Sequence, residues 1–325
     1  MRAEDCVQCG LCMTGCPYGL IYSASQTFDR LIRTGRITYY SGLLAVRVAQ
    51  RGEGEVVVTA LELGAKQRRD FTADRVFLAA GAIGTTRLVL GSLQQYKRPV
   101  ALRESAQFVV PSLSRRPTSD PRRLHTFTLN QFNLLVDTQG DGVELSQIHY
   151  YPYNPTFLAS LPGLLRDRPT SRSTSALLRR ISVGLGYLPS WNSPRLEVTA
   201  NPGPEGALPE LTVAQKHTVR ASPMLRLVLT TLVRAAPHLD LWPILPKVSV
   251  SQGGKSYHFG GSFPHSDDPA NAAPLASDRF GRLPQWDRVH LVDASVFPTV
   301  PATTFTLTVM ANAHRIANES LGLGS

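Results

Sequence analysis

Apolar residues follow two different periods along the chain, which predicts both strands and helices. Two strand-like runs lie between Ile37 and about Leu63, on either side of the glycine-containing turn at 51–54, and predict a hairpin. Residues 75–81 read Arg-Val-Phe-Leu-Ala-Ala-Gly, an apolar strand followed by small residues, and a helix is expected to begin at about Thr85. Small residues after a buried strand let the backbone approach a ligand closely, so this segment indicates an α/β nucleotide-binding fold.

The middle of the chain has a different pattern. Residues 126–136 and 143–151 alternate between apolar and polar positions, which predicts strands of an antiparallel sheet. Residues 223–239 have an apolar helical period. After about residue 255 the α/β pattern returns, with a strand at 289–295 that ends in a carboxylate and small residues, and a helix at 306–319.

Composition narrows the class of protein. The chain has 325 residues, of which 42% are hydrophobic and 18% charged, as in globular proteins, and this excludes disordered, collagen-like and coiled-coil chains. No apolar run approaches the roughly 20 residues of a membrane-spanning helix. The first residues lack the apolar core of a signal peptide. We therefore expect a soluble, cytoplasmic protein without a transmembrane segment.

The formal net charge is +10, and 29 of the 34 basic residues are arginines. These arginines are scattered along the sequence in small groups. A nucleic-acid-binding protein more often gathers basic residues on one face, together with aromatic residues. The charge therefore predicts an arginine-rich solvated surface, and no nucleic-acid partner.

All four cysteines lie within eleven residues, in the order Cys6, Cys9, Cys12 and Cys16, followed by Pro17. The spacing C-x2-C-x2-C-x3-C-P is the iron–sulfur pattern of bacterial ferredoxins. In two-cluster ferredoxins the fourth cysteine serves another cluster, and this chain has no second run of cysteines. The sequence thus leaves several readings open: an iron–sulfur cluster, a zinc ion, one disulfide, or a packed turn.

Four segments together resemble the glucose–methanol–choline (GMC) family of flavin oxidoreductases. Residues 292–298 and 306–317 are similar to the C-terminal signature of the family, and residues 258–262, His-Phe-Gly-Gly-Ser, to the segment with its active-site histidine. Residues 78–88 resemble a strand of its flavin domain. The cysteine run is similar to a stretch of the long-chain alcohol oxidase relatives. The 35 residues that separate His258 from Asp293 also match the family arrangement.

The resemblance implies an FAD-dependent enzyme that oxidises the CH–OH group of an alcohol or sugar-like substrate by hydride transfer to the flavin. An imidazole beside the flavin can take the hydroxyl proton at neutral pH, and His258 is the candidate base. Thr304 occupies the second catalytic position of the family, and His265 is a possible substitute in the same loop as His258. The residues implied to border the cofactor are Ala80, Gly81, Asp293, Ala294, Thr304 and Thr306.

Two departures from the family stand out. The second catalytic position is usually Asn or His, whereas Thr304 can orient a substrate by hydrogen bonding but is not a base near neutral pH. In addition, the chain contains no G-x-G-x-x-G, the fingerprint that holds the ADP part of FAD. A missing N-terminal polypeptide could carry that fingerprint. Residues 260–264 and 301–304 resemble bacterial members of the family that are associated with polysaccharides, which favours a sugar-derived substrate. The sequence does not identify the electron acceptor.

The predicted fold class is therefore α/β, or α+β overall: a partial, Rossmann-like FAD-binding domain with an inserted antiparallel-sheet substrate domain. Residues 1–100 and 255–325 are assigned to the FAD-binding domain, without its first βαβ unit, and 101–254 to the substrate domain. Two other functions remain open at this point. The chain could be a non-catalytic fragment or subunit of a split flavoenzyme, or an iron–sulfur electron-transfer protein.

Overall fold

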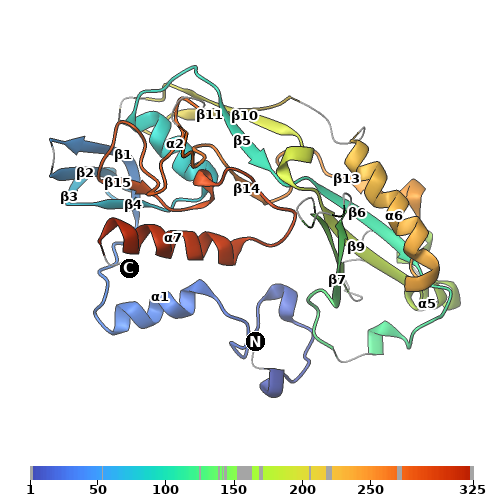
Figure 1. The fold of residues 1–325 in the computed structure, drawn as a ribbon. Helices are drawn as coiled ribbons and strands as arrows, with labels where there is room; N and C mark the ends of the chain where they lie inside the picture. The colour runs from blue at the N-terminus through green and yellow to red at the C-terminus, as the bar shows by residue number, and fades with distance from the viewer. Residues whose placement is uncertain are drawn as a thin grey trace. The chain divides into compact units, whose positions relative to one another are not determined.

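A computed structural model describes residues 3–52, 54–123, 126–137, 140, 142, 145–151, 163–167, 171–204, 206–216, 222–268 and 273–322. The chain forms two compact units, each built from three separate segments. Unit 1 comprises residues 1–40, 108–186 and 223–250, and unit 2 comprises residues 41–107, 187–222 and 251–325. Figure 1 shows the elements of both. Among the described residues, no helix is long and apolar enough to cross a membrane.

Unit 1 is organised around a largely antiparallel sheet in the order β12-β6-β9-β8-β7, with β13 also paired to β6. The first two residues of the predicted strand 143–151 lie outside the described residues, and the strand begins at Leu145. The elements of this unit are α1 (Ala24–Arg33), β6 (Gln107–Leu113), β7 (Phe132–Asp137), β8 (Leu145–Tyr151), α4 (Gly163–Arg166), α5 (Arg172–Leu178), β9 (Ile181–Tyr187), α6 (Pro223–Leu239), β12 (Trp242–Pro243) and β13 (Ser249–Val250).

Unit 2 has three small sheets, in the orders β1-β2-β3, β11-β10-β5-β14 and β15-β4. The first two are antiparallel, and β15 pairs with β4 in parallel. Its elements are β1 (Leu43–Arg51), β2 (Glu55–Glu62), β3 (Arg68–Ala73), β4 (Val76–Leu78), α2 (Ala82–Ser92), β5 (Val100–Glu104), β10 (Arg195–Asn201), β11 (Glu210–Gln215), β14 (Phe259–Gly260), β15 (Val289–Leu291) and α7 (Thr306–Ser320).

The two units do not coincide with the predicted domain boundaries. Residues 187–222 belong to unit 2 because they supply β10 and β11, and β10 pairs with β5. The opening segment 1–40, with the cysteines, groups with unit 1. The fold has the predicted mixture of helices with antiparallel sheets, but its parallel part has two strands, β4 and β15. A Rossmann-like flavin role for unit 2 and a substrate role for unit 1 stay predictions.

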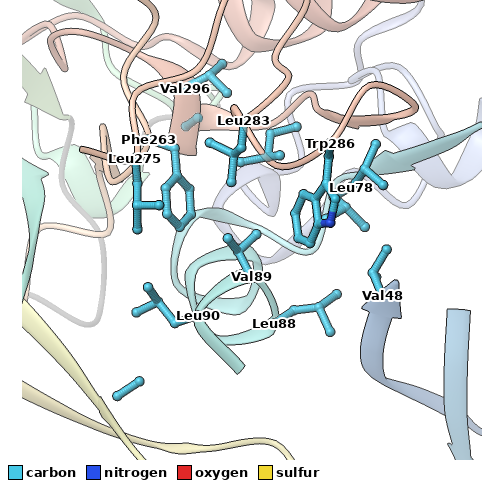
Figure 2. Packing of buried hydrophobic residues seen from close by; sticks show 14 of the residues in the cluster. Val48, Leu78, Leu88, Val89, Leu90, Phe263, Leu275, Leu283, Trp286 and Val296 are labelled. Carbon is cyan, nitrogen blue, oxygen red and sulfur yellow. The ribbon is translucent and has the colours of Figure 1, made fainter. Parts of the chain in front are cut away.

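The core of unit 2 surrounds α2. Leu88, Val89 and Leu90 of this helix are buried, and their side chains point in different directions (Figure 2). They pack with residues that come from distant parts of the sequence, including Val48, Leu78, Phe263, Leu275, Leu283, Trp286 and Val296. Because α2 begins directly after β4, this packing fixes the turn at 79–81 that joins them.

Removing a core side chain of this unit should lower its stability. Leu291 of β15 is fully buried, so Leu291→Ala should reduce the free energy of unfolding by about 2–5 kcal/mol through lost burial and the cavity left behind. Leu307 of α7 is 78% exposed, and the same substitution there should change it by less than about 0.5 kcal/mol. Urea unfolding followed by circular dichroism measures both. Equal effects would contradict this placement of the core.

His290 connects the parallel strands to the loop before them. It is buried, its ring stacks on Phe77 of the neighbouring strand at 5.1 Å, and its Nδ1 lies 2.9 Å from the carbonyl oxygen of Phe280. The carbonyl can only accept, so Nδ1 carries the proton in the neutral ring. Burial lowers the pKa of His290, with a smaller opposing effect of the Phe280 carbonyl.

Acidification should therefore destabilise the fold. Below a pH of about 6.5 an unfolded chain protonates this histidine, while the folded protein holds it neutral until its lower pKa is reached. Stability is then lost as the pH falls through this window. The loss between pH 7.5 and 5.5, measured by urea unfolding, should be smaller in His290→Gln than in the wild type, and unaltered in the exposed control His238→Gln. A wild-type stability that does not fall would contradict the expectation.

Candidate active site

The carboxyl ends of β4 and β15 bring two of the predicted cofactor segments together. The strands pair in register from Val76 opposite Val289 to Leu78 opposite Leu291. The pairing continues for one more residue, because the Val292 amide donates to the Leu78 carbonyl oxygen at 3.0 Å. The turn at Ala80–Gly81 and the turn at Asp293–Ala294 therefore begin at the same edge of the sheet. Ligands of α/β folds bind at this edge.

Asp293 fastens the two turns to each other. Its side chain is buried and accepts hydrogen bonds from the Ser295 amide at 2.9 Å and from the Thr85 hydroxyl at 2.5 Å. The Thr85 oxygen in turn accepts from the amide of Ala80 at 3.1 Å. Hydrogen bonds to a carboxylate are stronger than neutral ones, and they offset the cost of its burial. Asp293 thus determines the relative position of both turns.

The turn between β4 and α2 has room for a ligand. Ala80 and Gly81 are exposed, and a Cβ atom built on Gly81 would meet no atom within 4 Å. Gly81 has a φ of +78°, a conformation that side chains disfavour, and precedes the first residue of α2. Thr304 and Thr306 are also exposed, whereas Asp293 and Ala294 are buried behind the surface. These features fit one wall of a flavin site, although the contact of each residue with the cofactor stays a prediction.

The segment that follows His258 runs beside Ala294–Val296. The amides of Gly261, Phe263 and His265 donate to the carbonyl oxygens of Ala294, Ser295 and Val296 at 2.9, 2.8 and 2.8 Å. This ladder leaves no room for a side chain at Gly260, where a Cβ atom would come within 2.6 Å of the Ala294 carbonyl oxygen. The two glycines of the motif therefore permit close backbone approach.

His258 itself is half-buried between aromatic rings. Its imidazole stacks on Tyr187 with ring centroids 4.6 Å apart, and the edge of Phe305 approaches at 5.2 Å. Its carbonyl oxygen accepts from the Ser105 amide at 3.1 Å. Phe305 directly follows Thr304, so the turn with the second predicted catalytic position lies next to the imidazole. The structure thus brings the two predicted catalytic segments together, without establishing their roles.

Sequence reasoning missed three residues that position His258. Glu104 is buried and accepts from the amides of Gly254 and Ser256 at 2.8 and 3.1 Å, which holds the loop before the histidine. Tyr187 and Phe305 form the aromatic contacts of its ring. A glutamate on the buried side of an alternating strand was the one local signal for Glu104. No local signal pointed to the aromatic residues, which come from distant segments.

His265, the predicted substitute, is held in the interior of unit 2. Its Nδ1 lies 3.1 Å from the Ser277 hydroxyl and its Nε2 lies 3.4 Å from the Asn312 amide nitrogen. The amide nitrogen can only donate, so Nε2 accepts and Nδ1 carries the proton. Burial lowers the pKa of His265, against a smaller effect of the Asp278 backbone. This neutral, bonded imidazole favours a structural role, and His258 stays the better candidate base.

In unit 1 the four cysteines line one small pocket of about 20 Å³. The amide of Thr128 donates to the Cys12 sulfur at 3.4 Å. Hydrogen bonds from the backbone of Leu20, the strongest influence, and of its neighbours lower the pKa of Cys16, whose side chain is half-buried. Within the described residues, no three His, Cys, Asp or Glu side chains converge on a point that would suit a single metal ion. The iron–sulfur and zinc interpretations of the four cysteines stay predictions.

Comparison with known proteins supports the fold. No protein-family model and no curated protein matches this chain. Among solved structures, pyridoxine 4-oxidase from Mesorbium loti superimposes with a TM-score of 0.58 and 16% sequence identity, over 87% of this chain. The matched region spans 58% of the length of that protein. This likeness shows a shared fold, and it agrees with the GMC fold that the sequence motifs predict.

Proposed function

We propose that this chain supplies part of a GMC-type, FAD-dependent oxidoreductase that oxidises a CH–OH group of an alcohol or sugar-like substrate. The observation that carries the proposal is the assembly, within unit 2, of four motifs from different parts of the sequence: the 80–81 turn, the His258 segment, and the neighbouring 293–296 and 304–306 turns. The fold shared with an oxidase adds support.

When bound, a flavin would supply the acceptor for the hydride. Ala80 and Gly81, at the start of α2, would hold the cofactor from one side, since Gly81 leaves its surroundings open. Asp293 would keep this turn in place through its hydrogen bond with Thr85, without touching the cofactor itself. The chain lacks the glycine fingerprint, so the other wall of the cofactor site would come from a further polypeptide segment.

His258 would take the proton of the substrate hydroxyl at a ring nitrogen as the C–H bond is broken. The proton and the hydride leave the same CH–OH group, which becomes a carbonyl. Tyr187 stacks on one face of the ring and Phe305 makes an edge contact with it, and together they would restrain the ring plane. Thr304 would orient the hydroxyl as a hydrogen-bonding partner, because threonine is not a base near neutral pH.

The test begins with FAD binding. The purified 325-residue chain, incubated with FAD either alone or together with a segment that carries the glycine fingerprint, should retain a two-banded flavin spectrum after gel filtration. Anaerobic addition of alcohols, pyridoxine among them, and of sugars should bleach that spectrum. General base catalysis contributes typically 10²–10⁴-fold, so His258→Ala should slow bleaching by about that factor while FAD stays bound. Replacement of the exposed His314 by Ala is the matched control.

The outcomes separate the candidate functions. Bleaching at the wild-type rate in His258→Ala would overturn the assignment of the base. The chain could stay colourless alone and show a flavin spectrum only together with a segment that carries the fingerprint. That result would favour the hypothesis that the chain is a subunit of a split flavoenzyme. A chain that binds no flavin under either condition would contradict the proposal and favour a non-catalytic fragment.

A second candidate function, iron–sulfur electron transfer, is supported by one observation. The four cysteines, which have the spacing of bacterial ferredoxins, all line one small pocket. Anaerobic reconstitution should then give a broad brown absorbance with stoichiometric iron and sulfide, lost in Cys12→Ser and Cys16→Ser. Substitution of Thr14, which lies between them in sequence, by Ser should leave the absorbance intact. Reconstituted protein without bound iron would exclude this candidate.

A further inference from the structure

A pocket of unit 2 lies outside the proposed catalytic residues and is lined by three arginines. Arg98, Arg103 and Arg195 border an open cavity of about 160 Å³ together with residues 99–101, 261, 262, 264 and 273–275. None of the described residues that line it is acidic. Three arginines that line one cavity give it a positive charge.

The strand register places two of these arginines directly against each other. Arg103 of β5 is the cross-strand partner of Arg195 of β10, so both side chains extend from the same face of the sheet. Like charges in this relation destabilise a strand pair. Glu197, two residues along the same face of β10, could compensate, but it already pairs with Lys216 at 3.0 Å.

Arg103 is also incompletely bonded. Its Nε is buried and has no hydrogen-bond partner, and no ion pair involves Arg98, Arg103 or Arg195 within the part of the chain that the structure describes. A buried donor without an acceptor costs free energy and calls for an explanation. Burial, and to a smaller degree the charge of Arg195, lower the pKa of Arg103. A negatively charged ligand would give the buried Nε an acceptor and would offset the repulsion between Arg103 and Arg195.

The backbone is shaped to admit this arginine. Gly261 has a φ of +69°, and a Cβ atom at this position would come within 2.7 Å of Cδ of Arg103. The arginine stem therefore lies directly against the loop that continues from His258. Its opposite residue across the strand pair is Gly260. The absence of a side chain at Gly261 leaves the space that the Arg103 stem occupies.

We infer that this three-arginine pocket binds a phosphate or carboxylate group. The planar guanidinium fork matches both oxyanions with paired hydrogen bonds, and an anion between Arg103 and Arg195 would convert their repulsion into attraction to a shared partner. The anion could be a free ligand or a group of a larger molecule such as a dinucleotide. This inference does not depend on the flavin chemistry proposed above.

Calorimetric titration of the full chain with inorganic phosphate, at constant ionic strength and pH 7.5, tests the pocket. One phosphate should bind per chain, and Arg103→Gln and Arg195→Gln should each weaken binding at least tenfold. Arg234 of α6 is exposed and belongs to unit 1, so Arg234→Gln removes the same charge elsewhere and should leave the affinity unchanged. Equal weakening by all three variants, or no binding by the wild type, would overturn the inference.

Thermal unfolding tests the pocket independently and can detect a ligand that binds weakly. Without phosphate, Arg195→Gln should unfold at a higher temperature than the wild type, because the like-charge pair is gone. With saturating phosphate the unfolding temperature of the wild type should rise to that of Arg195→Gln or above it, since a ligand bound to the folded state stabilises it. A variant that is less stable without phosphate would contradict the like-charge pair.

A competition experiment then distinguishes the sources of the anion. If the pocket receives the diphosphate of FAD, FAD should displace phosphate from the chain and bind more weakly to Arg103→Gln. If it receives a separate ligand, FAD and phosphate should bind independently, and citrate should compete with phosphate instead. Displacement of phosphate by neither FAD nor citrate would mean that the pocket does not recognise oxyanions as a class, and would overturn the inference.

Discussion

The short hydrogen bond between Thr85 and Asp293 holds together the part of the fold on which the candidate site depends. These residues are 208 positions apart in sequence, and their oxygens lie 2.5 Å apart in the interior of unit 2. The threonine oxygen also accepts from Ala80, and the aspartate also accepts from Ser295. From Ala294–Val296 the backbone ladder continues to the segment after His258. A displaced carboxylate would therefore move the turn at 80–81 and the loop after His258 together.

Local sequence predicted the elements well where the pattern and the tertiary environment agree. Helix α6 occupies Pro223–Leu239 as its apolar period indicates, and α7 begins at the predicted Thr306. The β1–β2 hairpin turns at the glycine-containing segment. Helix α2 begins at Ala82, three residues before the predicted start, because Gly81 takes a positive φ and lets the helix start directly after the strand. Such a start depends on backbone conformation, which apolar periodicity does not report.

The domain boundaries and the surroundings of His258 were beyond sequence reasoning for a different reason. Residues 187–222 join unit 2 through the register of β10 with β5, a pairing between strands about 90 residues apart. Tyr187 and Phe305 reach the imidazole from separate segments. Both depend on long-range contacts, whereas the motif spacing reports only which residue types are present. The likeness to a known family identified His258 as a candidate, but it did not indicate what holds it.

The stacking of His258 has a direct chemical meaning. A ring nitrogen accepts a proton along its lone pair, which lies in the plane of the imidazole, so the orientation of that plane determines from which direction a substrate can deliver the proton. Tyr187 fixes the plane by stacking, and its own hydroxyl accepts from the Gln107 amide at 3.2 Å. Gln107 is in turn held by Ser251 at 3.0 Å. The plane of the His258 ring is thus held by a chain of contacts through Tyr187 and Gln107 to Ser251, so a substitution at Gln107 should change the orientation of the imidazole without altering the histidine itself.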